Sequence, residues 1–265
     1  MNELWALVYG FIQGISEFLP ISSSGHLALL PKLFEFRDPG VVFDLVMHLG
    51  TALAVIIYYR KELLKLINEG FQILKYKDLG RGVFFQNFIV STFFSFVFIL
   101  LIKDFALSFG RTEVLIGANL IFFGILMYLS DLSVQSNESL VEKKNYKKAA
   151  IIGISQSLAI FPGVSRSGIT LTSSRFLRIN RLEASRFSFL LSLPIILASI
   201  VYKIPEIYSG EAIHTSPVII IIGVLSSFVF GIITIHFFIK LISKMGLWGF
   251  TLYRILIGTI VICLA

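Results

Sequence analysis

Residues 20–26 of the chain read PISSSGH, and they interrupt a stretch that is otherwise apolar from residue 3 to residue 31. Proline and glycine break helices, and the backbone groups freed by a break inside a membrane must be buried in protein or line a wet cavity. A second apolar stretch, 147–177, is broken in the same way at residues 162–168, which read PGVSRSG. We therefore expect two helix–break–helix hairpins that dip into a bilayer.

The composition is that of an integral membrane protein, since 56% of the 265 residues are hydrophobic and only 15% are charged. A spanning helix needs roughly 17–25 apolar residues to cross a core of about 30 Å. The predicted fold is an all-α polytopic membrane protein with six transmembrane helices and two re-entrant helix pairs. The six predicted spans are 41–59, 84–103, 114–130, 184–203, 217–238 and 247–264.

The net charge of +7 is better explained by basic cytoplasmic loops than by nucleic acid, because no nucleic-acid-binding motif is present. Loops 60–83 and 131–148 carry six and four basic residues and are predicted to lie in the cytoplasm. If 147–177 re-enters rather than crosses, sixteen basic residues lie inside and five outside. Charge therefore favours re-entry for the second broken stretch and does not decide for the first.

The two breaks belong to an internal repeat. A shift of 143 residues superimposes Gly10 on Gly153, Gln13 on Gln156 and Ser22 on Ser165. Each half, 1–131 and 147–265, then holds one broken pair and three spans. Three is odd, so the halves insert in opposite directions, and such inverted repeats place their site at the interface between the halves near the bilayer midplane.

Chemistry is expected where the repeat does not match. Glu17 is replaced by Ile160 in the second half, His26 by Ile169, and Ser23 by Arg166. If the breaks meet, Glu17, His26 and Arg166 converge. A carboxylate at this depth costs roughly 2.5–3.5 kcal/mol on insertion scales, so a functional role is the default interpretation.

The roles follow from chemistry. Arg166 and the serine-rich helix starts suit a phosphate, and His26 is expected to pass a proton. Ser23 is the candidate nucleophile, with direct attack by water as the alternative. Glu17 is expected to orient His26, to hold a divalent cation, or both.

Three other polar residues are left undecided by the sequence. Asp44 and His48 are spaced i, i+4 in a predicted span, which suits support of the site and helix packing equally. Arg254 lies inside the last span, where pairing, snorkelling and function are open.

At these motifs the chain resembles the bacterial undecaprenyl-diphosphate phosphatases, also called bacitracin-resistance proteins. The resemblance rests on Gln13 and Glu17 followed by residues 20–27, on residues 162–170, and on residues 187–194, which read FSFLLSLP. It covers essentially the whole chain. It implies hydrolysis of undecaprenyl diphosphate to the monophosphate carrier for peptidoglycan synthesis, and bacitracin resistance.

The resemblance also implies an active site that faces outside in the bacterial inner membrane. It implies a divalent cation, Mg²⁺ or Ca²⁺, with Glu17 and Gln13 as its ligands. Apart from the catalytic residues, the residues expected to bind the polyprenyl diphosphate are Ser22, Ser24, Gly25, Gln156, Gly163, Ser165, Ser167, Gly168 and Thr170. A homodimer is left open by the sequence.

Other functions compete with this one. A transporter or flippase of polyprenyl phosphate lipids would use the same inverted architecture. A lipid phosphatase that forms a phospho-histidine needs a second histidine and an aspartate after its arginine, and residues 167–180 contain neither. A purely structural membrane protein is the remaining alternative.

Overall fold

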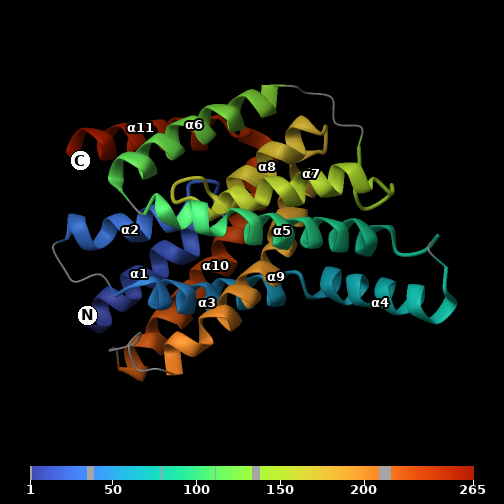
Figure 1. Cartoon of the computed structure of the whole chain (residues 1–265), viewed down its shortest axis with the longest axis horizontal. Helices are drawn as coiled ribbons and strands as arrows, with labels where there is room; N and C mark the ends of the chain where they lie inside the picture. The colour runs from blue at the N-terminus through green and yellow to red at the C-terminus, as the bar shows by residue number, and fades with distance from the viewer. Residues whose placement is uncertain (1, 35–38, 79, 111, 133–137, 209–215) are drawn as a thin grey trace.

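The computed structural model describes residues 2–265 except 35–38, 79, 111, 133–137 and 209–215, and the described chain is helical (Figure 1). The only strand-like feature among these residues is an isolated bridge between Glu138 and Ile179. The all-α prediction is thereby confirmed. The helices are α1 (Glu3–Ser16), α2 (Ser23–Leu33), α3 (Val41–Tyr58), α4 (Arg60–Tyr76), α5 (Val83–Ser108), α6 (Glu113–Leu132), α7 (Tyr146–Ser157), the 3₁₀ turn η1 (Leu158–Ile160), α8 (Arg166–Phe176), α9 (Arg181–Tyr208), α10 (Pro217–Met245) and α11 (Trp248–Leu264).

Four of these helices, α5, α6, α9 and α10, are long and apolar enough to cross a membrane. They coincide with four of the predicted spans. Helix α3 is long and apolar enough to cross only when it is taken together with α4, and the two helices are bent by 78° relative to each other. Helix α11 is a shorter apolar helix of 17 residues. The chain is therefore a multi-pass membrane protein, and its described residues form four spans by length and composition, or five if the bent pair counts as one.

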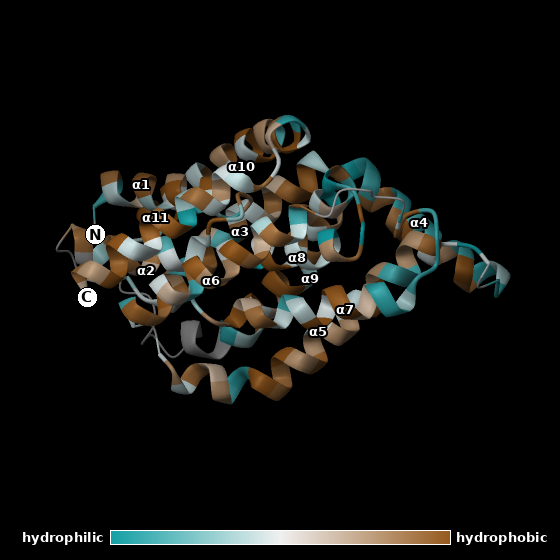
Figure 2. Cartoon of the chain, turned by 90° about the horizontal axis from the view of Figure 1, so that it is seen from above, coloured by the Kyte–Doolittle hydropathy of each residue, from teal (hydrophilic) through white to brown (hydrophobic). Residues whose placement is uncertain are grey.

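The region 60–83, predicted as a loop, is mostly the helix α4. Its buried residues Leu66 and Gly70 are spaced i, i+4 and face α5, where Gly70 lies against the ring of Phe85. Apolar residues recur at helical spacing over 63–74, so the sequence carries the signal of an amphipathic helix. The prediction was wrong because the six basic residues excluded a membrane span and a loop between spans was therefore predicted. Hydrophilic residues gather at the end of the molecule that carries α4 (Figure 2).

The two predicted helix–break–helix hairpins are present, as α1–α2 and as α7–η1–α8. Their breaks have one geometry, since Ser22 and Ser165 both adopt positive φ, 77° and 71°. Each serine Oγ then accepts from the backbone N–H of a glycine three residues later, Gly25 at 3.4 Å or Gly168 at 3.1 Å. A positive φ in a non-glycine residue costs of order 1–3 kcal/mol, and here the cap and the burial of both serines hold it.

The halves of the chain interlock. Helix α1 packs on α10, and its repeat partner α7 packs on α5, so each hairpin lies against a span of the other half. Glycines make these approaches close: a Cβ on Gly10 would lie 2.2 Å from Gly223 O, and one on Gly153 would lie 2.2 Å from Ser91 O. Small residues at these positions let the helix backbones of the two halves approach closely.

Arg254 of α11 joins the two breaks. Its side chain is fully buried, and its guanidinium donates only to backbone carbonyls among the hydrogen bonds of the described residues. Broken backbone inside a membrane needs such donors, because lipid offers none. The acceptors are Pro20 O in the first break, Gly163 O and Val164 O in the second, and Asn119 O and Leu120 O in α6, at 3.0–3.3 Å.

Replacing Arg254 by methionine is expected to lower the free energy of unfolding by at least about 3 kcal/mol, since each buried carbonyl left unpaired costs about 1–3 kcal/mol. Denaturant titration in mixed micelles measures this. The matched control is Arg186→Met, at an exposed arginine of α9, with an expected loss below about 0.5 kcal/mol. Equal losses for the two variants would contradict the bridging role.

Candidate active site

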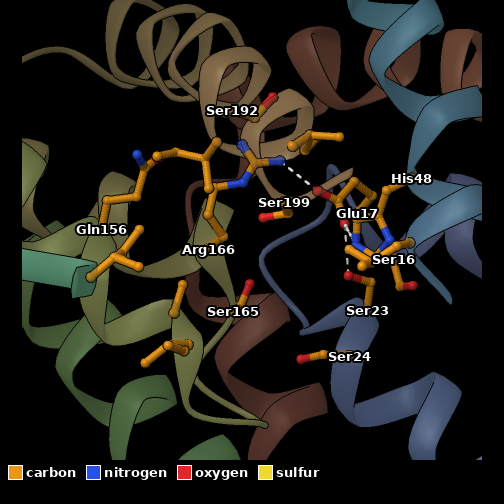
Figure 3. Close-up of a pocket in the computed structure, with 16 residues that line it drawn as sticks. Ser16, Glu17, Ser23, Ser24, His48, Gln156, Ser165, Arg166, Ser192 and Ser199 are labelled. Carbon is orange, nitrogen blue, oxygen red and sulfur yellow. Dashed lines mark hydrogen bonds and ion pairs between the residues drawn. The ribbon is translucent and has the colours of Figure 1, made fainter. Parts of the chain in front are cut away.

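The two breaks meet at a cavity of about 250 Å³ (Figure 3). Helices α2 and α8 both begin there, and the first N–H groups of a helix have no intrahelical acceptor. The remaining walls come from the end of α1, from α3, α5 and α9, and from the segment around η1. The lining residues are Ser16, Glu17, Ser23, Ser24, Leu45, His48, Ile99, Gln156, Ala159, Ile160, Ser165, Arg166, Ser192, Ile195, Ile196 and Ser199.

An ion pair joins the halves across this cavity. Arg166 Nη2 lies 2.6 Å from Glu17 Oε1, and Arg166 Nη1 donates to Ser188 O at 3.0 Å. The Glu17 side chain is 6% exposed and that of Arg166 is 13% exposed. The predicted meeting of Glu17 and Arg166 is therefore confirmed, although 149 residues separate them.

The other oxygen of Glu17 accepts from neighbours on α1 and α2. Ser23 Oγ donates to Glu17 Oε2 at 2.7 Å, and Gln13 Nε2 donates to the same oxygen at 3.1 Å. The Ser23 bond places a hydroxyl and a carboxylate in the geometry required for proton transfer between them. The i, i+4 spacing of Gln13 and Glu17 predicts that they share a helix face, and they do.

His48, whose role the sequence leaves undecided, completes the surroundings of Glu17. Its Nδ1 lies 2.7 Å from Asp44 O, and its Nε2 lies 3.3 Å from Glu17 Oε2. Nδ1 donates to this carbonyl, and Nε2 makes an ion-pair contact with the carboxylate when the ring is protonated. The i, i+4 spacing of Asp44 and His48 was the available signal, but nothing in it indicated Glu17.

His26 does not lie at the cavity with Glu17 and Arg166, so the expected convergence of these three residues is wrong for His26. Its Nδ1 donates to Ser22 O at 2.7 Å, and its Nε2 lies 2.7 Å from the hydroxyl of Tyr253, whose ring stacks on it. These contacts hold the imidazole on the α11 side of α2, and His26 does not line the cavity. A role of His26 in proton transfer stays a prediction.

The remaining predicted residues divide into two groups. Ser24, Gln156 and Ser165 line the cavity. The others build the turns around it. Ser22 caps α2, and Ser167 Oγ donates to Leu19 O at 3.1 Å. Thr170 Oγ1 donates to Arg166 O at 2.9 Å within α8. Gly163 has a φ of 90°, and a Cβ added there would meet Ile116 O, while a Cβ added to Gly168 would meet Arg254 Nη1.

Three further lining residues, Ser16, Ser192 and Ser199, were not predicted from the sequence. Ser192 lies within the FSFLLSLP motif, but neither its motif nor its spacing indicates that it faces the cavity. Serines inside apolar helices are common, so composition carries no signal for them.

The donor set for a metal ion is sparse. Within the described residues there is no group of three His, Cys, Asp or Glu side chains that could hold one. Gln13 Oε1, however, is buried without a hydrogen-bond partner, and Gln13 contacts Glu17. Mg²⁺ in phosphate sites is commonly held by one or two protein ligands, by water and by substrate oxygens. Glu17 and Gln13 thus fit an ion that arrives with a phosphate, and they do not form a cage by themselves.

The family described as "Bacitracin resistance protein BacA" matches residues 6–260 of the chain. The chain belongs to this family. Full-length relatives agree: an "Undecaprenyl-diphosphatase" of Marinobacter nauticus is 37% identical over 262 residues, which cover 98% of each chain. A second protein with this name, from Desulforudis audaxviator, is 38% identical and covers 100% of this chain and 98% of its own. A third, from Saccharophagus degradans, is 38% identical over 258 residues, with 97% of this chain and 96% of its own covered.

In this member of the BacA family, Glu17 and Arg166 are expected to be energetically coupled. Removing one partner of a buried ion pair leaves an uncompensated charge, so Glu17→Gln and Arg166→Met together should cost less than the sum of the single losses, by about 1–3 kcal/mol. A double-mutant cycle on the free energy of unfolding in mixed micelles measures this coupling.

The control cycle pairs Arg166→Met with His26→Ala, which no contact joins. We expect additivity within about 0.5 kcal/mol there. Additive losses for Glu17 and Arg166, or coupling of similar size for His26, would contradict the geometry described above.

Proposed function

We propose that this chain hydrolyses undecaprenyl diphosphate to undecaprenyl phosphate and inorganic phosphate. The names of its full-length relatives support this substrate. The observation that carries the proposal is the cavity in which the starts of α2 and α8 and the guanidinium of Arg166 surround a Ser23–Glu17 pair. Helix N-termini and a planar guanidinium are both suited to phosphate oxygens, while the prenyl chain stays in the bilayer.

Arg166 takes the terminal phosphate in this proposal. Its side chain now bonds Glu17 and Ser188 O, and a bound diphosphate competes with the carboxylate for the guanidinium. Transfer of Arg166 from Glu17 Oε1 to phosphate removes a positive charge from the carboxylate, which makes Glu17 a stronger base for the Ser23 proton. Arg166 then balances the charge that develops on the transferring phosphoryl group.

Ser23 is the proposed nucleophile. Its Oγ attacks the terminal phosphorus while its proton passes to Glu17 Oε2, and the P–O bond to undecaprenyl phosphate breaks. Glu17 passes this proton to the departing undecaprenyl phosphate. Water then attacks the phosphoserine, Glu17 takes one proton from that water and returns it to Ser23 Oγ, and the bond between Ser23 Oγ and phosphorus breaks as phosphate is released. Direct attack by a water held by Glu17 is the alternative, and Ser23 would then only position that water.

A divalent cation, Mg²⁺ or Ca²⁺, is part of the proposal. Glu17 and the buried Gln13 Oε1 are the residues that would hold it together with diphosphate oxygens. When bound, the ion would supply charge neutralisation for the diphosphate.

The proposed topology has six spans, α3, α5, α6, α9, α10 and α11, with the two hairpins re-entrant from opposite faces. The basic segments 60–83 and 131–148 then lie in the cytoplasm, and both termini lie together at the other end of the molecule from α4 (Figure 1). Leu45 and His48 line the cavity from the half of α3 remote from α4, and Ile99 lines it from the second half of α5. This supports an active site that opens outside.

The activity is tested by phosphate release from undecaprenyl diphosphate by purified protein in detergent. Ser23→Ala is expected to lower kcat at least about 100-fold, because the nucleophile is lost. The matched control is Ser24→Ala, which also lines the cavity but makes only a 3.4 Å contact with Ser22 Oγ, and it should lose no more than about fivefold. EDTA should abolish release, and added Mg²⁺ or Ca²⁺ should restore it.

Equal and small losses of kcat in both serine variants would indicate that water, not Ser23, is the nucleophile. No phosphate release by the unaltered chain, with the lipid instead crossing vesicle membranes, would favour the transporter.

The topology is tested by labelling single cysteines from outside the cell in a Cys263→Ser background. Asp104→Cys should react with a membrane-impermeant maleimide in intact cells, whereas Lys144→Cys should react only after permeabilisation. Arg186→Cys should behave like Lys144→Cys if the second hairpin re-enters. Labelling of position 186 from outside would mean that residues 147–177 cross the membrane.

A further inference from the structure

His48 lies beside Glu17 on a different element from every other partner of that carboxylate (Figure 3). Its Nε2 is 3.3 Å from Glu17 Oε2, and its ring lines the cavity from α3. Arg166 holds the other oxygen, Oε1, from the opposite half of the chain. His48 and Arg166 therefore contact different oxygens of Glu17.

The direction of the His48 ring is set by its own helix. Nδ1 donates to the carbonyl of Asp44, one turn earlier, at 2.7 Å. This bond leaves Nε2 as the nitrogen that faces Glu17 Oε2, with which it makes an ion-pair contact at 3.3 Å. Helix α3 thus presents Nε2 to Oε2 in a fixed direction.

Glu17 Oε2 is also the oxygen that accepts from Ser23, at 2.7 Å. Glu17 caps the C-terminal end of α1, and its flexible side chain leaves the carboxylate to be oriented by its partners. Without His48, the strongest remaining partner is Arg166 at 2.6 Å, which pulls on Oε1. Only the neutral donors Ser23 and Gln13 then hold Oε2 against that pull, so the carboxylate can turn toward Arg166 and away from the hydroxyl of Ser23.

We propose that His48 is a positioning residue, which holds the Glu17 carboxylate with Oε2 toward Ser23 so that this oxygen can take the Ser23 proton. The inference rests on the proposed function. It assigns His48 to the chemical step rather than to substrate binding, because Arg166 and the starts of α2 and α8 provide the contacts proposed for phosphate. A loss of His48 should therefore act on kcat and leave KM almost unchanged.

Two variants of similar size distinguish a role of His48 as a hydrogen-bond donor from a role in packing alone. His48→Gln keeps an N–H that can point to Glu17, whereas His48→Met has similar size and no donor. Thr51→Val is the matched control, since Thr51 is a fully buried residue one turn further along α3 whose hydroxyl bonds only its own helix, at His48 O. All are assayed as full-length protein in detergent for release of phosphate from undecaprenyl diphosphate.

His48→Met is expected to lower kcat at least tenfold with KM within about twofold of the unaltered chain. His48→Gln should recover kcat to within about fivefold, and Thr51→Val should stay within about twofold. Thermal unfolding in the same detergent establishes that each variant is folded, and His48→Leu replaces His48→Met if the latter is not.

A methionine variant that keeps more than half of the kcat, or a glutamine variant no better than methionine, would overturn the positioning role while the proposed function stands. A change in KM alone would also overturn it. An unaltered chain that releases no phosphate would overturn the proposed function itself, and this inference with it.

Discussion

The backbone of this protein is broken twice in apolar surroundings, and the freed carbonyls must find donors there because lipid provides none. Arg254 meets that requirement for both breaks at once, with bonds to Pro20 O, Gly163 O and Val164 O. A guanidinium suits this task because its five N–H groups lie in one rigid plane. Arg254 thereby helps to fix the position of the two breaks relative to each other, together with the Ser167 bond to Leu19 O and the Glu17–Arg166 ion pair.

The repeat supplies a scaffold, and departures from the repeat supply the chemistry. Ser22 and Ser165 take the same positive φ and cap their helices in the same way, so both breaks deliver a helix start to the cavity. Glu17, Ser23 and Arg166 have no counterpart of their own kind in the other half. A symmetric frame thereby carries an asymmetric site with a base, a hydroxyl and an anion-binding cation.

Much of this arrangement is readable from local pattern. Proline and glycine in apolar runs predict both hairpins, and the shift of 143 residues predicts that Glu17 and Arg166 share one site. Helix α4 was missed because its six basic residues exclude a membrane span, although its apolar residues recur at helical spacing. His26 was placed in the site because its residue type suits catalysis, while its ring in fact bonds Ser22 and Tyr253.

The sequence by itself determined the class of protein, the two breaks, the repeat and the residue types from which a phosphate site can be built. These properties are local, because hydropathy, helix breaking and capping depend on neighbours in the chain. Only the tertiary structure decided that Arg254 bonds the breaks, that His48 rather than His26 faces Glu17, and that α3 and α9 wall the cavity. Those contacts join residues far apart in the chain, and the direction of a side chain around its helix is set by whichever partner is packed there.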